Sequence, residues 1–171
     1  MKIAVNPIKP SLPTQGICYL VRVDKDSDLW IEYIVDIVTL PPHLYCLFTG
    51  RYDLSVVKQT FFMVSFYTLD ALLCGRSLYE PEPRMRYGKE ELDEMLLKGI
   101  GRAIAAFMQQ REACTLIAFP ARPGLARMYH KLLSAHAQSS GCRYIKHYKE
   151  EGIYVIEKEP GEAECRAWPL T

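Results

Sequence analysis

Three side chains of this 171-residue sequence stand where they could move protons. Tyr129 lies in a predicted helix, Gly124–Gln138, and a phenol there could protonate a leaving group. Glu32 and Asp36 are four residues apart on a predicted strand, so their carboxylates share one face and either could take a proton from an amine. The alternatives are a core tyrosine with its hydroxyl at the surface, and ordinary surface carboxylates.

Glycine and basic residues at two places could hold a phosphate group. Gly99 and Gly101 lie in the middle of a predicted helix, where glycine allows either close approach to an anion or close packing on a sheet. A second set directly precedes that helix: Arg84, Arg86, Gly88 and Lys89. This set offers charge-assisted donors and a flexible helix entry, or it is a solvated basic loop.

The elements that must position these residues alternate between helix and strand in the C-terminal half. Leucine and isoleucine recur at three- to four-residue steps in Lys89–Arg111, which predicts one long amphipathic helix. Cys114–Phe119 is a short apolar run between two helices, so it is predicted to be a buried strand. Tyr144–Lys149 and Ile153–Lys158 follow the second helix as a predicted hairpin.

The N-terminal half is predicted to be nearly all strand. Alternating or apolar runs bounded by turn residues indicate four antiparallel strands: Ile17–Val23, Leu29–Leu40, Leu44–Thr49 and Thr60–Leu73. Residues 1–16 carry three prolines and are expected to be an extended lead-in or an edge segment, and 74–88 a loop. Residues 160–171 are expected to be a surface tail.

We therefore predict a single α+β domain over 1–171. It has a mixed, mainly antiparallel sheet from the strand meander at 17–73, followed by α-β-α-β-β at 89–158. A chain of this length can bury a substantial core.

Two motifs in this arrangement resemble the GNAT superfamily of N-acetyltransferases. Lys98–Ala103 is similar to the Gly-x-Gly element of that family, and Leu125–Leu132 is similar to its tyrosine-bearing helix. The resemblance covers about residues 60–158. Phe119–Ala121, followed by Arg127–Tyr129, also resembles acetyltransferase-like proteins of phages.

The resemblance implies an acyl-CoA N-acyltransferase-like fold that binds acetyl-CoA and transfers an acetyl group to an amine of unknown identity. Gly99, Gly101 and Arg127 would then contact the cofactor, and Tyr129 would protonate the coenzyme A thiolate. The thioester is expected between the strands at 60–73 and 114–119. The first alternative is a non-catalytic module on the same scaffold, of phage or mobile-element type, that binds or inhibits a protein partner.

Charge suggests a further alternative. Segment 113–149 contains no acidic residue, and its tyrosines interleave with basic residues, so it could bind nucleic acid. The net charge of +1 argues against a dedicated nucleic-acid binder.

No apolar run is long enough for a membrane span and no signal peptide is evident, so we expect a cytoplasmic protein. The six cysteines are scattered without metal-ligand spacing. An edge strand at 17–23 could pair with a second subunit in a homodimer.

Overall fold

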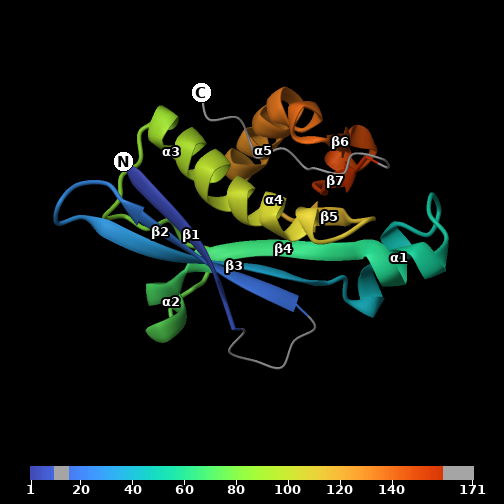
Figure 1. Ribbon diagram of the computed structural model, residues 1–171, viewed down its shortest axis with the longest axis horizontal. Coiled ribbons are helices and arrows are strands. Elements are labelled where there is room, and N and C mark those ends of the chain that lie inside the picture. The colour runs from blue at the N-terminus through green and yellow to red at the C-terminus, as the bar shows by residue number, and fades with distance from the viewer. Residues whose placement is uncertain (10–15, 160–171) are drawn as a thin grey trace.

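A mixed sheet forms the centre of the computed structural model, which describes residues 1–9 and 16–159. Seven strands pair in the order β1-β2-β3-β4-β5-β7-β6 (Figure 1). Their bounds are Lys2–Ile8 (β1), Gly16–Asp24 (β2), Trp30–Thr39 (β3), Phe61–Thr68 (β4), Thr115–Ala118 (β5), Cys142–Ile145 (β6) and Tyr154–Lys158 (β7). Every neighbouring pair is antiparallel except β4 and β5, which are parallel.

Helices lie on both faces of this sheet. The α-helices are Leu54–Thr60 (α1), Leu69–Leu73 (α2), Lys89–Met95 (α3), Arg102–Gln109 (α4) and Pro123–His136 (α5). Helices α3, α4 and α5 cover one face, and α2 lies on the other (Figure 1). The prediction of an α+β fold with a mixed, mainly antiparallel sheet is confirmed.

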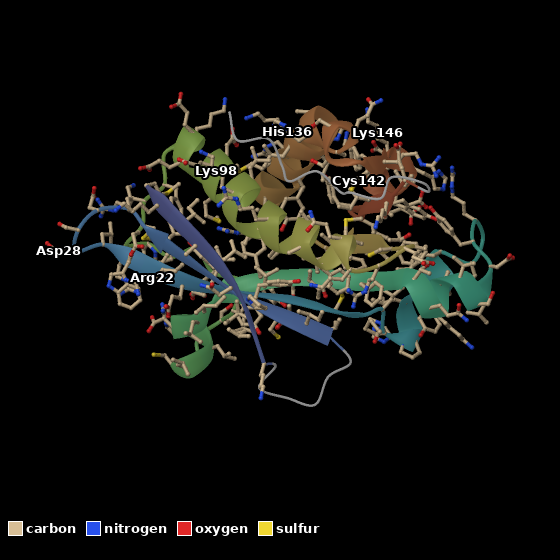
Figure 2. All side chains as sticks on the ribbon, in the orientation of Figure 1. Arg22, Asp28, Lys98, His136, Cys142 and Lys146 are labelled. Carbon is tan, nitrogen blue, oxygen red and sulfur yellow. The ribbon has the colours of Figure 1, made fainter. Side chains whose placement is uncertain are left out.

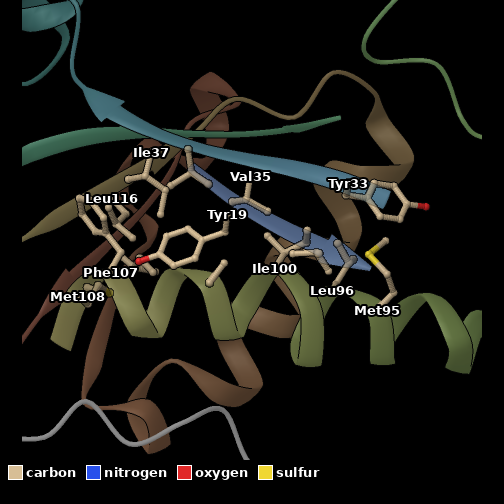
Figure 3. Packing of buried hydrophobic residues seen from close by; sticks show 14 of the residues in the cluster. Tyr19, Tyr33, Val35, Ile37, Met95, Leu96, Ile100, Phe107, Met108 and Leu116 are labelled. Atoms are coloured by element: carbon tan, nitrogen blue, oxygen red, sulfur yellow. The ribbon is translucent and has the colours of Figure 1, made fainter. Parts of the chain in front are cut away.

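Strand alternation builds the main core on the face covered by α3 and α4. Tyr33, Val35 and Ile37 point from β3 toward the helices, as period-two alternation requires (Figure 3). Ile100 and Phe107 meet them from the helical layer. Burial of these large apolar side chains is the main stabilising contribution of this layer.

A second, smaller core lies on the opposite face. Phe48 and Phe61 stack edge to face with ring centroids 5.3 Å apart, and Tyr148 packs against Phe48 at 5.1 Å. This core is covered by α1 and by two 3-10 helices, Pro42–Leu47 (η1) and Lys146–Glu151 (η4). It packs under the start of β4, where that strand pairs with β5.

The predicted long helix is continuous through α3 and α4, but its middle, Leu96–Gly101 (η2), is π-helical. Its apolar stripe advances by four residues at each step from Leu92 to Ile104. An α-helix has 3.6 residues per turn, so such a stripe would drift round the axis by about 40° per step. The wider π turn reduces this drift and keeps the stripe over the sheet.

Gly99 brings this helix into close contact with the sheet. A Cβ on Gly99 would lie 2.8 Å from Cγ1 of Val21 and 3.6 Å from Cγ2 of Ile3. Val21 is fully buried and β-branched, so it has little freedom to move. The packing interpretation of this glycine is therefore confirmed.

Helical turns replace the predicted strand structure at two places between β3 and the loop. Leu44–Thr49 is wrong as a strand, because Pro42 begins the 3-10 helix η1 there. The predicted strand Thr60–Leu73 ends at Thr68. The hydroxyl oxygen of Thr68 accepts a hydrogen bond from the backbone amide of Ala71, so Thr68 caps the start of α2. The loop predicted at 74–88 is confirmed, since its residues carry only turns and bends.

Two further corrections concern the ends of the sheet. Residues 17–23 are not an edge, because β1 pairs with β2 from Cys18 to Asp24 and β3 pairs with its other side. The prediction that this strand offers a free edge to a second subunit is therefore wrong, and the homodimer stays a prediction. The edge is β1 itself, within the predicted lead-in. At the other end, β6 ends at Ile145, and η4 occupies the predicted strand residues Lys146–Lys149. The tail at 160–171 lies outside the described residues.

Replacing Gly99 with alanine should destabilise the protein by about 1 kcal/mol, because the clash with Val21 outweighs the gain in helix propensity. Urea unfolding measures this difference. Val21→Ala removes the clashing methyl group, so the double variant should lose less stability than the two single losses added together. A stabilising or strictly additive result would contradict the close contact.

Candidate functional site

The parallel pairing of β4 with β5 stops before β4 ends. Partners run from Phe61 opposite Thr115 to Val64 opposite Ala118. Strand β4 then continues to Thr68 along β3, with no described strand on its other side. Backbone groups of 65–68 that point away from β3 therefore lack a strand partner.

A cleft of about 540 Å³ lies beside this end of β4. Both Phe66 and Tyr67 line it, although successive side chains of a strand point to opposite faces of the sheet. The cleft thus reaches both faces. Its other walls are loop residues 78–83, the second half of α3 and the first turns of α5.

A smaller, apolar pocket of about 80 Å³ adjoins the cleft, because Phe66 and Leu96 line both. It lies among β4, β5, β7, η2 and α5. Gly101 lines this pocket from the π-helical segment, and no charged side chain lines the pocket. The prediction that Gly101 contacts a cofactor stays a prediction. A contact at Gly101 would be with an apolar part of that cofactor.

Tyr129 lines the apolar pocket from α5. Its ring packs edge to face on Tyr154, with centroids 5.7 Å apart. Burial raises the pKa of Tyr129 well above its usual value, so the phenol is neutral near pH 7. It can donate a proton but cannot serve as a base there.

The two predicted carboxylates have different surroundings. Glu32 lines neither the cleft nor the pocket and faces Arg22, 3.9 Å away across the strand pair. Asp36 accepts hydrogen bonds from the Cys18 thiol at 2.6 Å and from the hydroxyl of Tyr67. Since Tyr67 lines the cleft, it connects Asp36 to that space.

Tyr67 is the residue that the sequence analysis missed. Burial and its hydrogen bond to Asp36 raise the pKa of Tyr67 above its usual value. The same causes raise the pKa of the Cys18 thiol to about 12, so Cys18 is no nucleophile at neutral pH. Position near the end of an aromatic strand is the only sequence signal that could have pointed to Tyr67.

The predicted basic set divides between structural and cleft-facing roles. Nε of Arg84 donates a hydrogen bond to Oε1 of Glu82 at 2.8 Å. The amide of Gly88 donates to the Glu91 carboxylate at 2.8 Å, so this helix entry, beside Lys89, is partly capped. Arg86 lines the cleft with φ of 39°, a conformation that costs an ordinary residue roughly 1–2 kcal/mol.

The start of α5 supplies further positive character at the cleft. Arg122 and Gly124 line it, and the first turn of α5 has no acidic residue and no side-chain cap. Nη2 of Arg127 lies 3.9 Å from where a Cβ of Gly124 would be. Unpaired amides at a helix start and nearby guanidinium groups favour an anion.

Glu82 anchors the loop that walls the cleft. One carboxylate oxygen of Glu82 accepts hydrogen bonds from the backbone amide and from Nε of Arg84. The other oxygen lies 3.7 Å from Nη2 of Arg76. Asp70 of α2 pairs with both arginines. The Arg84 hydrogen bond lowers the pKa of Glu82, whose side chain is only 3% exposed.

The basic segment 113–149 is partly neutralised by acidic residues from elsewhere. Arg143 pairs with Glu157 at 2.6 Å, and Lys131 pairs with Asp93. Tyr148 is 3% exposed, so it cannot stack on a base. His136 and Lys146 lie on the helical side of the molecule, far from Arg22 at the sheet end (Figure 2).

No protein-family model, curated protein or solved structure matches this chain. Within the described ranges 1–9 and 16–159, no helix has the length and apolar character to cross a membrane. In the same ranges, no three His, Cys, Asp or Glu side chains are grouped to hold a metal ion.

Replacing Glu82 with glutamine should lower the free energy of unfolding by about 1 kcal/mol at pH 7. The folded-state pKa of Glu82 is depressed, so its contribution is full above the unfolded pKa of about 4.3 and is lost as pH falls through the lower folded value. Chemical unfolding at several pH values should therefore show the variants converging below about pH 4. Glu80→Gln on the same loop is the control and should change little, and a pH-independent difference for Glu82 would contradict this account.

Proposed function

We propose that the protein binds an acyl-CoA thioester in the cleft beside β4 and transfers its acyl group to an amine. The observation that carries this proposal is the cleft itself, which lies where β4 continues past its parallel partner and is lined from both faces of the sheet. A donor and an acceptor can approach the same strand edge from opposite sides. Holding two bound reactants in contact can make a large contribution to the rate.

Three features support this assignment of the donor. The diphosphate of coenzyme A would lie toward the first turn of α5, beside Arg122 and Arg127. The pantetheine arm would run along the unpaired edge of Ser65–Thr68 and satisfy its backbone groups. The acyl group would enter the apolar pocket. This is the acyl-CoA N-acyltransferase-like arrangement that the GNAT resemblance implies, with the anion site shifted from Gly99 to the start of α5.

The proposed chemistry uses side chains on both hollows. The amine nitrogen attacks the thioester carbonyl, a C–N bond forms, and the C–S bond breaks. The carboxylate of Asp36 is the base: it takes the hydroxyl proton of Tyr67 as the oxygen of Tyr67 takes the proton that the amine loses. The neutral phenol of Tyr129 donates a proton to the departing thiolate.

One observation favours the alternative of a non-catalytic binding module. Gly99 is explained by its contact with Val21, so the glycine element on which the resemblance depends has a packing role. In that case the cleft would hold a segment of a protein partner. Binding of coenzyme A distinguishes the two functions.

Isothermal titration of acetyl-CoA into the protein should give saturable binding with Kd in the low micromolar range. Ala118→Phe would fill the pocket at the end of β5 and should weaken binding tenfold or more. Ala113→Phe adds the same ring to an exposed site before β5 and should leave Kd unchanged. Absence of heat at high micromolar acetyl-CoA would refute the enzyme and leave the binding module.

Tyr67→Phe should lower the rate of thiol release from acetyl-CoA in the presence of a mixture of primary amines by tenfold or more, because it removes the relay to Asp36. Asp36→Asn should act in the same direction. Tyr79→Phe is the control, since Tyr79 lines the cleft but is 53% exposed and bonded to neither residue. Equal rates for all three variants would remove Tyr67 from the mechanism.

A further inference from the structure

The apolar pocket offers more space than an acetyl group needs. Its lining consists of aliphatic side chains, two glycine or alanine positions and the rings of Phe66, Tyr129 and Tyr154. No charged side chain lines it. Apolar cavities of this kind stay dry and accept apolar ligands.

Its volume limits what can enter. The pocket measures about 80 Å³. An engineered cavity of roughly 150 Å³ accepts benzene, with its six carbons. By this proportion the pocket takes a chain of about three or four carbons, and a long fatty chain does not fit.

Its position determines what that chain must be joined to. Phe66 and Leu96 line both hollows, so a group in the pocket continues into the cleft at these side chains. The cleft carries Arg86 and Arg122 together with Glu80 and Glu82, whereas no charged side chain lines the pocket. The occupant is therefore amphipathic, with a short apolar tail and a polar head, and the unpaired amides at the start of α5 favour an anionic group on that head.

We propose that the preferred donor is a short-chain acyl thioester of about three or four carbons, such as butyryl-CoA, and not acetyl-CoA. This inference rests on the proposed function for the identity of the head group. Leu132, Leu133 and Ile156 line the pocket but not the cleft, so in this proposal they limit the length of the acyl chain.

The test is a series of titrations with free CoA and with acetyl-, butyryl- and octanoyl-CoA. Two additional buried methylenes should make butyryl-CoA bind about tenfold more tightly than acetyl-CoA. Octanoyl-CoA should bind more weakly than butyryl-CoA because its chain exceeds the pocket. Equal affinities, or tightest binding of acetyl- or octanoyl-CoA, would overturn the inference.

Leu133 provides variants that change the preference in both directions. Leu133→Ala lengthens the pocket and should shift the optimum to a longer chain, whereas Leu133→Phe shortens it and should shift the optimum to acetyl. Leu73→Ala is the control, because Leu73 is exposed on α2 and lines neither the cleft nor the pocket. An unchanged order of affinities in both Leu133 variants would also overturn the inference, and thermal unfolding of each variant confirms that it is folded.

Free carboxylates separate this inference from the proposed function. If no CoA compound binds, the acyltransferase proposal fails, and millimolar butyrate and octanoate are added to the protein with isotope-labelled methyl groups. Shifts of the Leu132 and Ile156 methyl signals with butyrate, lost in Leu133→Phe, would support a short-chain pocket even then. No shift with butyrate, or equal shifts with octanoate, would refute it.

Discussion

The architecture depends on the short length of the parallel pairing between β4 and β5. The parallel pair extends only from Phe61 to Val64 on β4, while β3 supports β4 as far as Thr68. Because β5 is buried between its neighbours and ends at Ala118, the chain must leave the sheet there and enter α5. That departure leaves one edge of β4 without a described strand, and both hollows lie along this edge.

Close contact between the long helix and the sheet on one side accompanies open space on the other. Gly99 brings the π-helical segment against Val21, at the β1–β2 side of the sheet. Leu96 and Ile100 of the same segment line the apolar pocket toward β4 and β5. A residue larger than glycine at 99 would lift the helix from β2 and alter the pocket with it.

The sequence was sufficient to predict the helices and strands whose apolar periodicity is strong. It was not sufficient where the residue that starts a short helix determines the local structure. The long helix, the buried strand at 115–118 and α5 follow from regular apolar spacing. The turns at η1 and α2 depend on Pro42 and on the Thr68 side chain, which short apolar runs do not reveal. Of the candidate site, Asp36 and Tyr129 could be proposed from residue type, whereas Tyr67 and Arg122 could not. Their place at the cleft depends on β4 continuing past the end of β5, which only tertiary pairing determines.

Access from both faces of the sheet has a kinetic consequence for acyl transfer. In the acyl transfer that we propose, donor and acceptor need not share one entrance, so both could be bound before the reaction begins. No described nucleophile has to store the acyl group, and the Cys18 thiol is held neutral by burial and by Asp36, which raise its pKa to about 12. The rate law of the proposed enzyme would be sequential, with a ternary complex, and double-reciprocal plots at different acceptor concentrations would intersect instead of running parallel.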